Sequence, residues 1–229
     1  MKTAIWIHGC QGKVGRALQE ALESAPAFWY AGGSASAQPL TADSLASTTS
    51  IVDFSSVTGN AALLAFIQQV EIPLWILLGT TGLSEAQLQA WRDVSLRHRV
   101  LYAANCSLGV LVLSRLLRQA KVLASLGFDV EMREIHQRNK KDAPSGTALY
   151  LAEQLGSLNP SIASVRGGEG LGEHTIEFLG PQERLTLCHQ SLSRMVYAQG
   201  ALRLMTWLQK QTVGYYTLDQ VEITEKGLA

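Results

Sequence analysis

The segment Thr3-Ala-Ile-Trp-Ile-His-Gly-Cys-Gln-Gly-Lys-Val-Gly15 decides the fold of this chain. Its first six residues are mostly apolar and predict a strand buried on both faces. Glycines follow at positions 9, 12 and 15, and apolar residues then recur at helical spacing. A strand, a glycine turn and a helix in this order are typical of a dinucleotide loop, where backbone N–H groups and the positive helix end hold phosphates. A purely structural turn is the alternative.

Short strands and helices alternate through the first half of the chain. This alternation predicts a Rossmann-like, doubly wound parallel sheet. The expected strands are 3–8, 28–31, 51–54, 73–78 and 100–103, and the expected helices include 60–70 and 84–98. Ser84 and Gln87 fit a capping box at the start of the second of these helices.

The pattern changes after about residue 107 to one long helix followed by strands with few helices between them. The expected elements are helices 108–126, 148–155 and 200–209 and strands 129–136, 161–166, 175–179 and 185–191. We therefore expect an α/β chain with a dinucleotide-binding domain at 1–107, to which 208–229 returns. A C-terminal α+β domain at 108–207, with an open mixed sheet, would serve substrate binding and oligomerisation.

Composition excludes several classes of protein. The chain has 229 residues, 47% of them apolar and 17% charged, with a net formal charge of zero. Neither nucleic acid nor an anionic membrane is therefore an expected partner. The three cysteines (Cys10, Cys106 and Cys188) are far apart, which argues against a disulfide framework or a metal site and favours the cytoplasm.

The segment Glu134-Ile-His-Gln-Arg-Asn-Lys-Lys-Asp-Ala-Pro-Ser-Gly-Thr-Ala148 concentrates the chemistry. His136 has the side chain whose unperturbed pKa lies near neutral pH, as a proton donor requires, and Lys140 supplies a cation. Ser145, Gly146 and Thr147 follow a proline at an expected helix start, where N–H groups and hydroxyls bind a carboxylate. These residues predict a site for an anionic small molecule.

Together, the glycine loop and the 134–148 segment resemble the dihydrodipicolinate reductase family, and the resemblance extends from residue 3 to about 221. It implies NAD(P)H-dependent reduction of 4-hydroxy-tetrahydrodipicolinate to tetrahydrodipicolinate in diaminopimelate and lysine synthesis, without a metal. It makes His136 and Lys140 the catalytic pair, and Gln137, Ser145, Gly146 and Thr147 substrate-binding residues. It also implies a homotetramer formed through the second sheet.

The resemblance extends to the cofactor site. The expected cofactor-binding residues are Gly9, Gln11, Gly12, Lys13, Val14, Gly15, Ser34, Gly79, Thr80, Thr81, Ala104, Asn105 and Cys106. Gly79-Thr80-Thr81-Gly82 matches the loop that lies against the nicotinamide in the family. The alternative interpretation is a structural turn that is rich in small residues.

Three positions depart from the family pattern. Gln137 replaces the second of two adjacent histidines and cannot carry a charge. Cys106 replaces an apolar residue, so a buried thiol is an alternative to a cofactor contact. The region 31–36 offers no acid for a ribose, and Ser34 and Ser36 are candidates to bond a 2′-phosphate, which favours NADPH over NADH. A dehydrogenase of homoserine type and a non-catalytic NAD(P) sensor remain the rival hypotheses.

Overall fold

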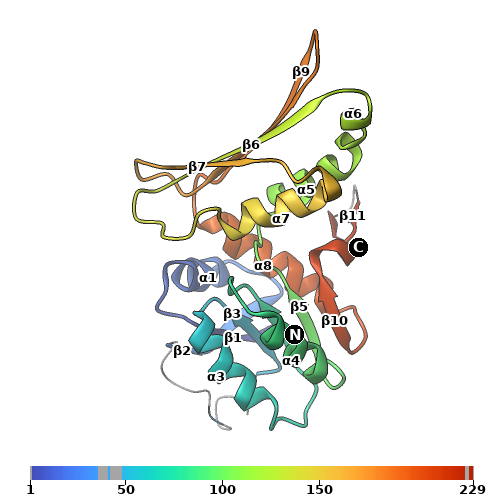
Figure 1. Ribbon diagram of the computed structural model, residues 1–229. Coiled ribbons are helices and arrows are strands. Elements are labelled where there is room, and N and C mark those ends of the chain that lie inside the picture. Colours follow the sequence, from blue (N-terminus) through green and yellow to red (C-terminus); the bar gives the residue numbers. More distant parts are fainter. Residues whose placement is uncertain (1, 36–40, 42–47, 225–226, 229) are drawn as a thin grey trace. The chain divides into compact units, whose positions relative to one another are not determined.

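The computed structural model describes residues 2–35, 41, 48–224 and 227–228 (Figure 1). Ser36, a candidate for the 2′-phosphate, lies outside this range. The chain divides into two compact units. The first comprises Met1–Cys106 and Tyr197–Ala229, and the second comprises Ser107–Val196.

The first unit is built on a parallel sheet of strands in the order β10-β5-β4-β3-β1-β2. The strands are β1 (Thr3–His8), β2 (Phe28–Ser34), β3 (Ser50–Asp53), β4 (Trp75–Leu78), β5 (Arg99–Tyr102) and β10 (Gly214–Thr217). Every strand pairing in this described sheet is parallel. The predicted Rossmann-like sheet is therefore confirmed.

Ile51 and Val52 are consecutive residues of a central strand, so they point to opposite faces of the sheet, and both are fully buried. Helices therefore cover both faces. The helices are α1 (Lys13–Glu23), α3 (Val57–Ile67), α4 (Glu85–Val94) and α8 (Met195–Leu208). Ile51 packs with Ile67 of α3 and Trp91 of α4 in one core cluster. The predicted capping box is present, since Ser84 Oγ accepts from Gln87 N and Gln87 Oε1 accepts from Ser84 N.

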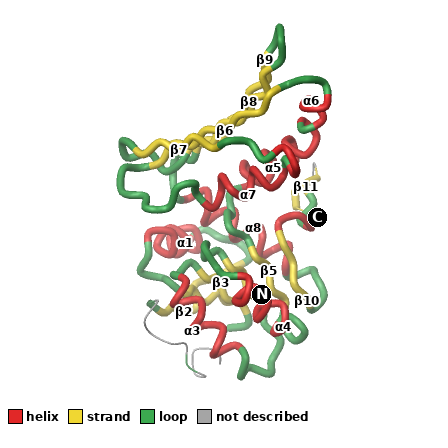
Figure 2. The backbone as a smooth tube through the Cα atoms, viewed as in Figure 1, coloured by secondary structure: helices red, strands yellow, loops and turns green. Residues whose placement is uncertain are grey.

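The second unit is a mixed sheet in the order β7-β6-β8-β9, with helices on one face (Figure 2). Its strands are β6 (Asp129–His136), β7 (Ile162–Arg166), β8 (Glu173–Leu179) and β9 (Arg184–Gln190). Strand β6 pairs parallel with β7 and antiparallel with β8. The core joins Met132, Ile176 and Phe178 of the sheet to Leu117 and Leu151 of the helices. The predicted open mixed sheet is confirmed.

The helix expected at 108–126 is in fact two, α5 (Leu108–Ala120) and α6 (Val122–Ser125), separated at Lys121. The second is tightened by hydrogen bonds spanning three residues, such as Leu126 N to Leu123 O, and the turn ends at Gly127 with φ of 89°. Helix α7 (Gly146–Gln154) begins two residues earlier than expected, and the short η1 (Gly156–Leu158) follows it.

The last elements were not predicted from the sequence. They are β10, η2 (Leu218–Gln220), β11 (Ile223–Thr224) and β12 (Gly227–Leu228). Strand β10 pairs parallel with β5, so residues 214–217 extend the first sheet beyond the strands that precede residue 107.

Candidate active site

The predicted cofactor residues of the first unit gather at the carboxyl edge of its parallel sheet. The Gly9 turn follows β1, the Gly79 turn follows β4, and residues 104–106 follow β5. Since these strands are parallel, their carboxyl ends lie at the same edge (Figure 1). The strand order reverses beside β1, and that reversal is where open α/β sheets bind ligands.

Two of the three glycines of the loop, Gly9 and Gly15, are required by the backbone itself. Gly9 has φ of 84°, and a Cβ there would lie 2.5 Å from the carbonyl oxygen of Phe54. A Cβ on Gly15 would overlap the carbonyl oxygen of Gly9, so α1 meets the turn at a distance that only glycine permits. Gly12 is the N-cap of α1, and no side chain in the described part of the chain caps it. The first-turn N–H groups thus suit a pyrophosphate.

Phe54, to which the sequence assigned no role, joins two of these turns. Its carbonyl lies against Gly9, and its ring occupies the space that a side chain on Gly79 would need. Asp53 braces the segment that follows, because it accepts hydrogen bonds from Ser55 N at 3.0 Å and Asn60 Nδ2 at 2.8 Å. The two loops are therefore held in a fixed relation.

The remaining cofactor candidates differ in what they present. Thr80 Oγ1 is buried and has no hydrogen-bond partner among the described residues, which suits a group that meets a ligand. Ser34 is buried, and its hydroxyl lies 2.7 Å from His8 Nδ1. Burial raises the pKa of the Cys106 thiol to about 12, and its side chain is enclosed. The Cys106 thiol is therefore closed to a ligand.

In the second unit, the 134–148 segment is assembled around the end of β6 and the start of α7. His136 is the last residue of β6, and Ser145 is the N-cap of α7, with its Oγ accepting from Ala148 N at 3.1 Å. The expected helix N-terminus is thus present. Its first N–H, that of Ser145, is already directed at a protein carboxylate, Glu134, at 3.1 Å. Gly146 and Thr147 remain as the candidates for a substrate carboxylate.

Glu134 is a buried acid that sequence reasoning did not single out. Its side chain is fully buried and also accepts hydrogen bonds from Ser164 Oγ at 2.8 Å and Arg166 Nη2 at 2.7 Å. Burial alone would raise its pKa, but the hydrogen bonds from Ser145, Arg166 and Ser164 lower the pKa to about 2. The carboxylate is therefore charged. The sequence did contain a signal for this contact, because residues two apart on a strand point to the same face and Glu134 stands two positions before His136.

Two histidines meet beside this carboxylate. The rings of His136 and His174 pack edge to face, and both Nδ1 atoms are buried without a hydrogen-bond partner in the described chain. Burial lowers the pKa of His136, and Lys140 and Arg166 add to that effect while Glu134 opposes it. For His174, burial and the charge of His136 lower the pKa to about 4. His174 is therefore neutral at physiological pH.

Lys140 lies in the loop after β6, and its Nζ donates to Asp142 Oδ2 at 2.9 Å. Burial acts to raise the pKa of Asp142, but the hydrogen bond and charge of Lys140 lower it overall. The lysine side chain is 25% exposed, so a ligand can reach it. Gln137 beside it is half-buried.

Glu134, His136 and His174 also have the donor types of a metal site, with ligating atoms within 4.8 Å of one another. However, the Arg166 guanidinium already binds the same carboxylate at 2.7 Å. Its positive charge opposes a second cation there. The arrangement suits an acid–base histidine better than a metal.

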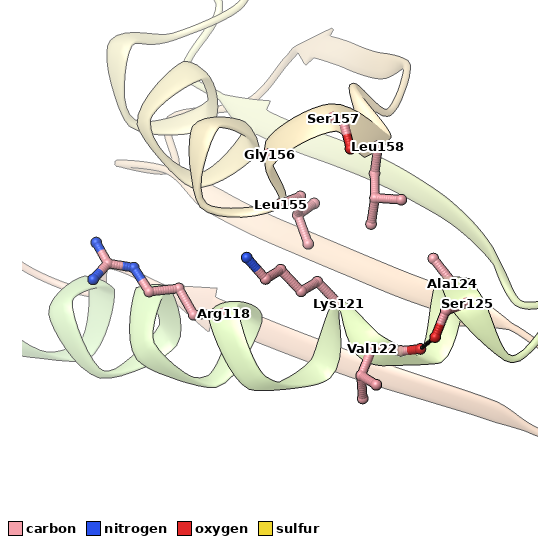
Figure 3. Close-up of a pocket in the computed structure, with 9 residues that line it drawn as sticks. All are labelled: Arg118, Lys121, Val122, Ala124, Ser125, Leu155, Gly156, Ser157 and Leu158. Atoms are coloured by element: carbon pink, nitrogen blue, oxygen red, sulfur yellow. Dashed lines mark hydrogen bonds between the residues drawn. The ribbon is translucent and has the colours of Figure 1, made fainter.

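A pocket of about 550 Å³ in the second unit lies apart from these residues (Figure 3). It is lined by Arg118, Lys121, Val122, Ala124, Ser125, Leu155, Gly156, Ser157 and Leu158. None of the predicted site residues lines it.

No helix in the described ranges is long and apolar enough to span a bilayer.

A parallel sheet with a glycine-rich phosphate cradle, joined in one chain to a unit with a buried histidine–carboxylate cluster, defines an NAD(P)H-dependent oxidoreductase. The chain belongs to the dihydrodipicolinate reductase family. Residues 3–106 match the family model for the dihydrodipicolinate reductase N-terminus, and residues 109–221 match the model for its C-terminus.

Full-length relatives agree with this assignment. The 4-hydroxy-tetrahydrodipicolinate reductase of Gluconacetobacter diazotrophicus is 36% identical over an alignment that covers 95% of this chain and 96% of the relative. The protein of the same name from Caldanaerobacter subterraneus subsp. tengcongensis is 33% identical, covering 99% and 100%.

Solved structures support the fold. Dipicolinate-bound dihydrodipicolinate reductase from Paenisporosarcina sp. TG-14 superimposes with a TM-score of 0.73 at 18% identity, covering 95% of this chain and 98% of that one. A diaminopimelate dehydrogenase of C. glutamicum, in complex with DAP, has a TM-score of 0.56 at 10% identity, covering 96% and 94%.

Proposed function

We propose that this chain catalyses the reaction that names its relatives, the reduction of 4-hydroxy-tetrahydrodipicolinate to tetrahydrodipicolinate by NAD(P)H. One hydride and one proton enter the substrate, and one water leaves. The observation that carries the proposal is the cluster of the second unit, where His136, a fixed anion and the N-terminus of α7 lie together. The reaction belongs to diaminopimelate and lysine synthesis.

His136 is the proposed proton donor. It is a buried ring with a titratable nitrogen, next to a carboxylate that favours its charged form. Lys140 is the proposed cation for a substrate carboxylate or for charge that develops on the ring. Gly146 and Thr147, at the positive end of α7, are proposed to bind a second carboxylate. Gln137 is proposed to donate a hydrogen bond to the substrate.

The dinucleotide supplies the hydride when it is bound. We propose that Gly9, Gln11, Gly12, Lys13, Val14 and Gly15 hold its pyrophosphate, and that Gly79, Thr80, Thr81, Ala104, Asn105 and Cys106 line its nicotinamide end. For the last of these, the proposed contact is through the backbone, because the thiol is enclosed.

NADPH is the proposed preferred cofactor. The end of β2 carries no acid to repel a 2′-phosphate, and Lys13 and Arg16 are exposed cations beside the glycine loop. The buried Ser34 hydroxyl is engaged by His8, so the preference is proposed to arise from the absent acid and the loop cations rather than from Ser34.

We further propose a cytoplasmic homotetramer. All three cysteines are free thiols, in agreement with a reducing compartment. In the second unit, the helices pack against one face of the sheet, and the other face carries Glu131, Arg133 and Cys188, which are exposed. Light scattering after gel filtration tests the assembly, since a monomer of 24.8 kDa is readily distinguished from four copies.

A coupled assay tests the reaction. The substrate is generated from pyruvate and aspartate semialdehyde by the preceding synthase, and the absorbance of NADPH and of NADH is followed in separate runs. Substrate-dependent oxidation is expected, faster with NADPH. Cofactor binding without oxidation of either would leave the non-catalytic sensor as the better hypothesis.

A further inference from the structure

We propose that Glu134 is a positioning residue for His136. Its carboxylate faces Nδ1, keeps a proton on that atom and leaves Nε2 as the atom that passes a proton to the substrate. The inference rests on the proposed reductase function, in which His136 is the donor, and deepens it.

The two side chains meet because of strand geometry. Glu134 and His136 are two residues apart on β6 and therefore point to the same face. Glu134 Oε2 lies 3.4 Å from His136 Nδ1, and Nδ1 has no hydrogen bond within the described residues. Such a contact is often long before substrate binds and shortens in the complex. The carboxylate is thus placed to accept a hydrogen bond from the Nδ1–H group.

The carboxylate is held from two further directions, so it cannot turn away from the ring. Strand β7 supplies the Ser164 hydroxyl at 2.8 Å and the Arg166 guanidinium at 2.7 Å, both to Oε1. Helix α7 supplies the Ser145 N–H at 3.1 Å to both oxygens. The direction of the His136 ring is therefore tied to the start of the helix that is proposed to bind substrate.

The charge on Glu134 is constant over the range in which a histidine titrates, because hydrogen bonds outweigh burial and lower its pKa to about 2. The fixed Glu134 anion attracts an N–H group at Nδ1 and would repel a lone pair there. Nδ1 therefore carries a proton both in the imidazolium and in the neutral ring that remains after donation. Proton transfer then proceeds from Nε2.

The opposite edge of the ring lies against Gly172, where only a residue without a Cβ fits. A Cβ on Gly172 would lie 2.7 Å from Nε2, and its φ of 148° is one that residues with side chains rarely adopt. The sequence assigned this glycine no role. The absence of a side chain there avoids a clash with Nε2.

Several other titratable or charged groups face His136. Lys140 and Asp142 approach from the loop, Arg166 from β7 and His174 from β8. Burial, Lys140 and Arg166 oppose protonation of His136, whereas Glu134 and Asp142 favour it. Glu134 is the first of the two favourable charges, so neutralising it should make the imidazolium harder to form.

The kinetic test compares Glu134→Gln with Ser164→Ala across pH. Because an acid catalyst must be protonated, the basic limb of kcat/KM should move to lower pH in Glu134→Gln by about one unit, a tenfold loss on the falling side. Ser164→Ala removes a hydrogen bond to the same carboxylate and keeps its charge. The basic limb of kcat/KM in Ser164→Ala should therefore stay at the pH of the parent protein. A uniform loss at every pH in Glu134→Gln would mean a structural role only and would overturn the proposal.

A second measurement does not need turnover. Nitrogen NMR of histidine-labelled protein, with His136→Gln used to assign the signal, reports which ring nitrogen is protonated and the pKa. The neutral ring should carry its proton on Nδ1, and the pKa should fall in Glu134→Gln. A proton on Nε2, or an unchanged pKa, would overturn the proposal even if the reductase assay succeeds. Failure of that assay with the expected NMR result would reject the reaction and not the pair.

Glu134→Gln leaves Arg166 without its anion, and the variant can fail to fold for that reason. Glu134→Asp keeps the charge on a shorter side chain. In Glu134→Asp the basic limb should also move to lower pH, but by less than in Glu134→Gln, and the pKa of His136 should fall by less. An unchanged limb and pKa in a folded Glu134→Asp protein would also contradict the proposal.

Discussion

The imidazole rings of His136 and His174 meet edge to face, with centroids 5.1 Å apart and planes at 74°. His174 Nε2 also lies 3.2 Å from Ser145 Oγ, so the second ring supports both His136 and the N-cap of α7. Its pKa of about 4 means that the fold holds this ring neutral. That property has a measurable consequence for stability.

Acid should destabilise the protein through His174. Above pH 6.5 the ring is neutral in both the folded and unfolded states and contributes nothing to the pH dependence. As the pH falls from 6.5 towards 4, the unfolded chain binds a proton that the folded chain does not, so stability is lost, by up to about 3 kcal/mol. Urea unfolding at pH 7 and pH 5 should show a smaller difference for His174→Gln than for the parent. Equal differences would contradict the neutral buried ring.

Replacing His136 should separate chemistry from cofactor binding. His136→Gln keeps hydrogen-bonding capacity without a titratable group, so kcat should fall about 10²- to 10⁴-fold. NADPH affinity, followed by fluorescence, should change less than about twofold, because the glycine loop belongs to the other unit. An unchanged kcat would exclude His136 as the proton donor.

Gln137 offers a gain-of-function test. A charged histidine bonds a carboxylate more strongly than a neutral amide does, by roughly 1 kcal/mol. Gln137→His should therefore lower KM about fivefold at pH 6, with kcat little changed. The gain should shrink at pH 8, where an unperturbed histidine is neutral. Gln137→Asn, neutral at both pH values, is the matched control.

Gly200 tests the packing of the first unit. A Cβ at this position of α8 would overlap the carbonyl oxygen of Cys106. Alanine gains about 1 kcal/mol in helix propensity, but the overlap should cost more, leaving a net loss of about 1–3 kcal/mol. Thermal unfolding measures the difference. Gly170→Ala is the control, because no atom lies within 4 Å of its added Cβ, and its stability should stay within about 0.5 kcal/mol.

Local signals explain which parts of the fold could be predicted. The strand, glycine turn and helix at 3–23 are determined by adjacent residues, and Ser145 is a local N-cap. Strand β10, by contrast, pairs with β5 more than 100 residues earlier, with Gly214 opposite Arg99, and its short sequence carries no record of that partner. Tertiary pairing of this kind has no local sequence signal.

The candidate site was partly predictable for the same reason. His136 and Lys140 stand close together in the sequence and have distinctive chemistry. Glu134 was passed over because an acid on a strand usually faces solvent, and the partners that hold it, Ser164 and Arg166, lie on β7 about 30 residues away. Gly172 was missed because its role depends on a ring brought to it by the pairing of β6 with β8.

The position of β10 also bears on how the chain folds during synthesis. The first sheet is left with an uncovered edge at β5 until residues 214–217 emerge, after the whole of the second unit has been made. An unpaired parallel edge invites association with other chains. Strand β10 takes over the edge position, and Val100 and Leu101 of β5 are then fully buried. Termination before residue 214 should therefore expose these two apolar residues and yield aggregates rather than a smaller dinucleotide-binding protein.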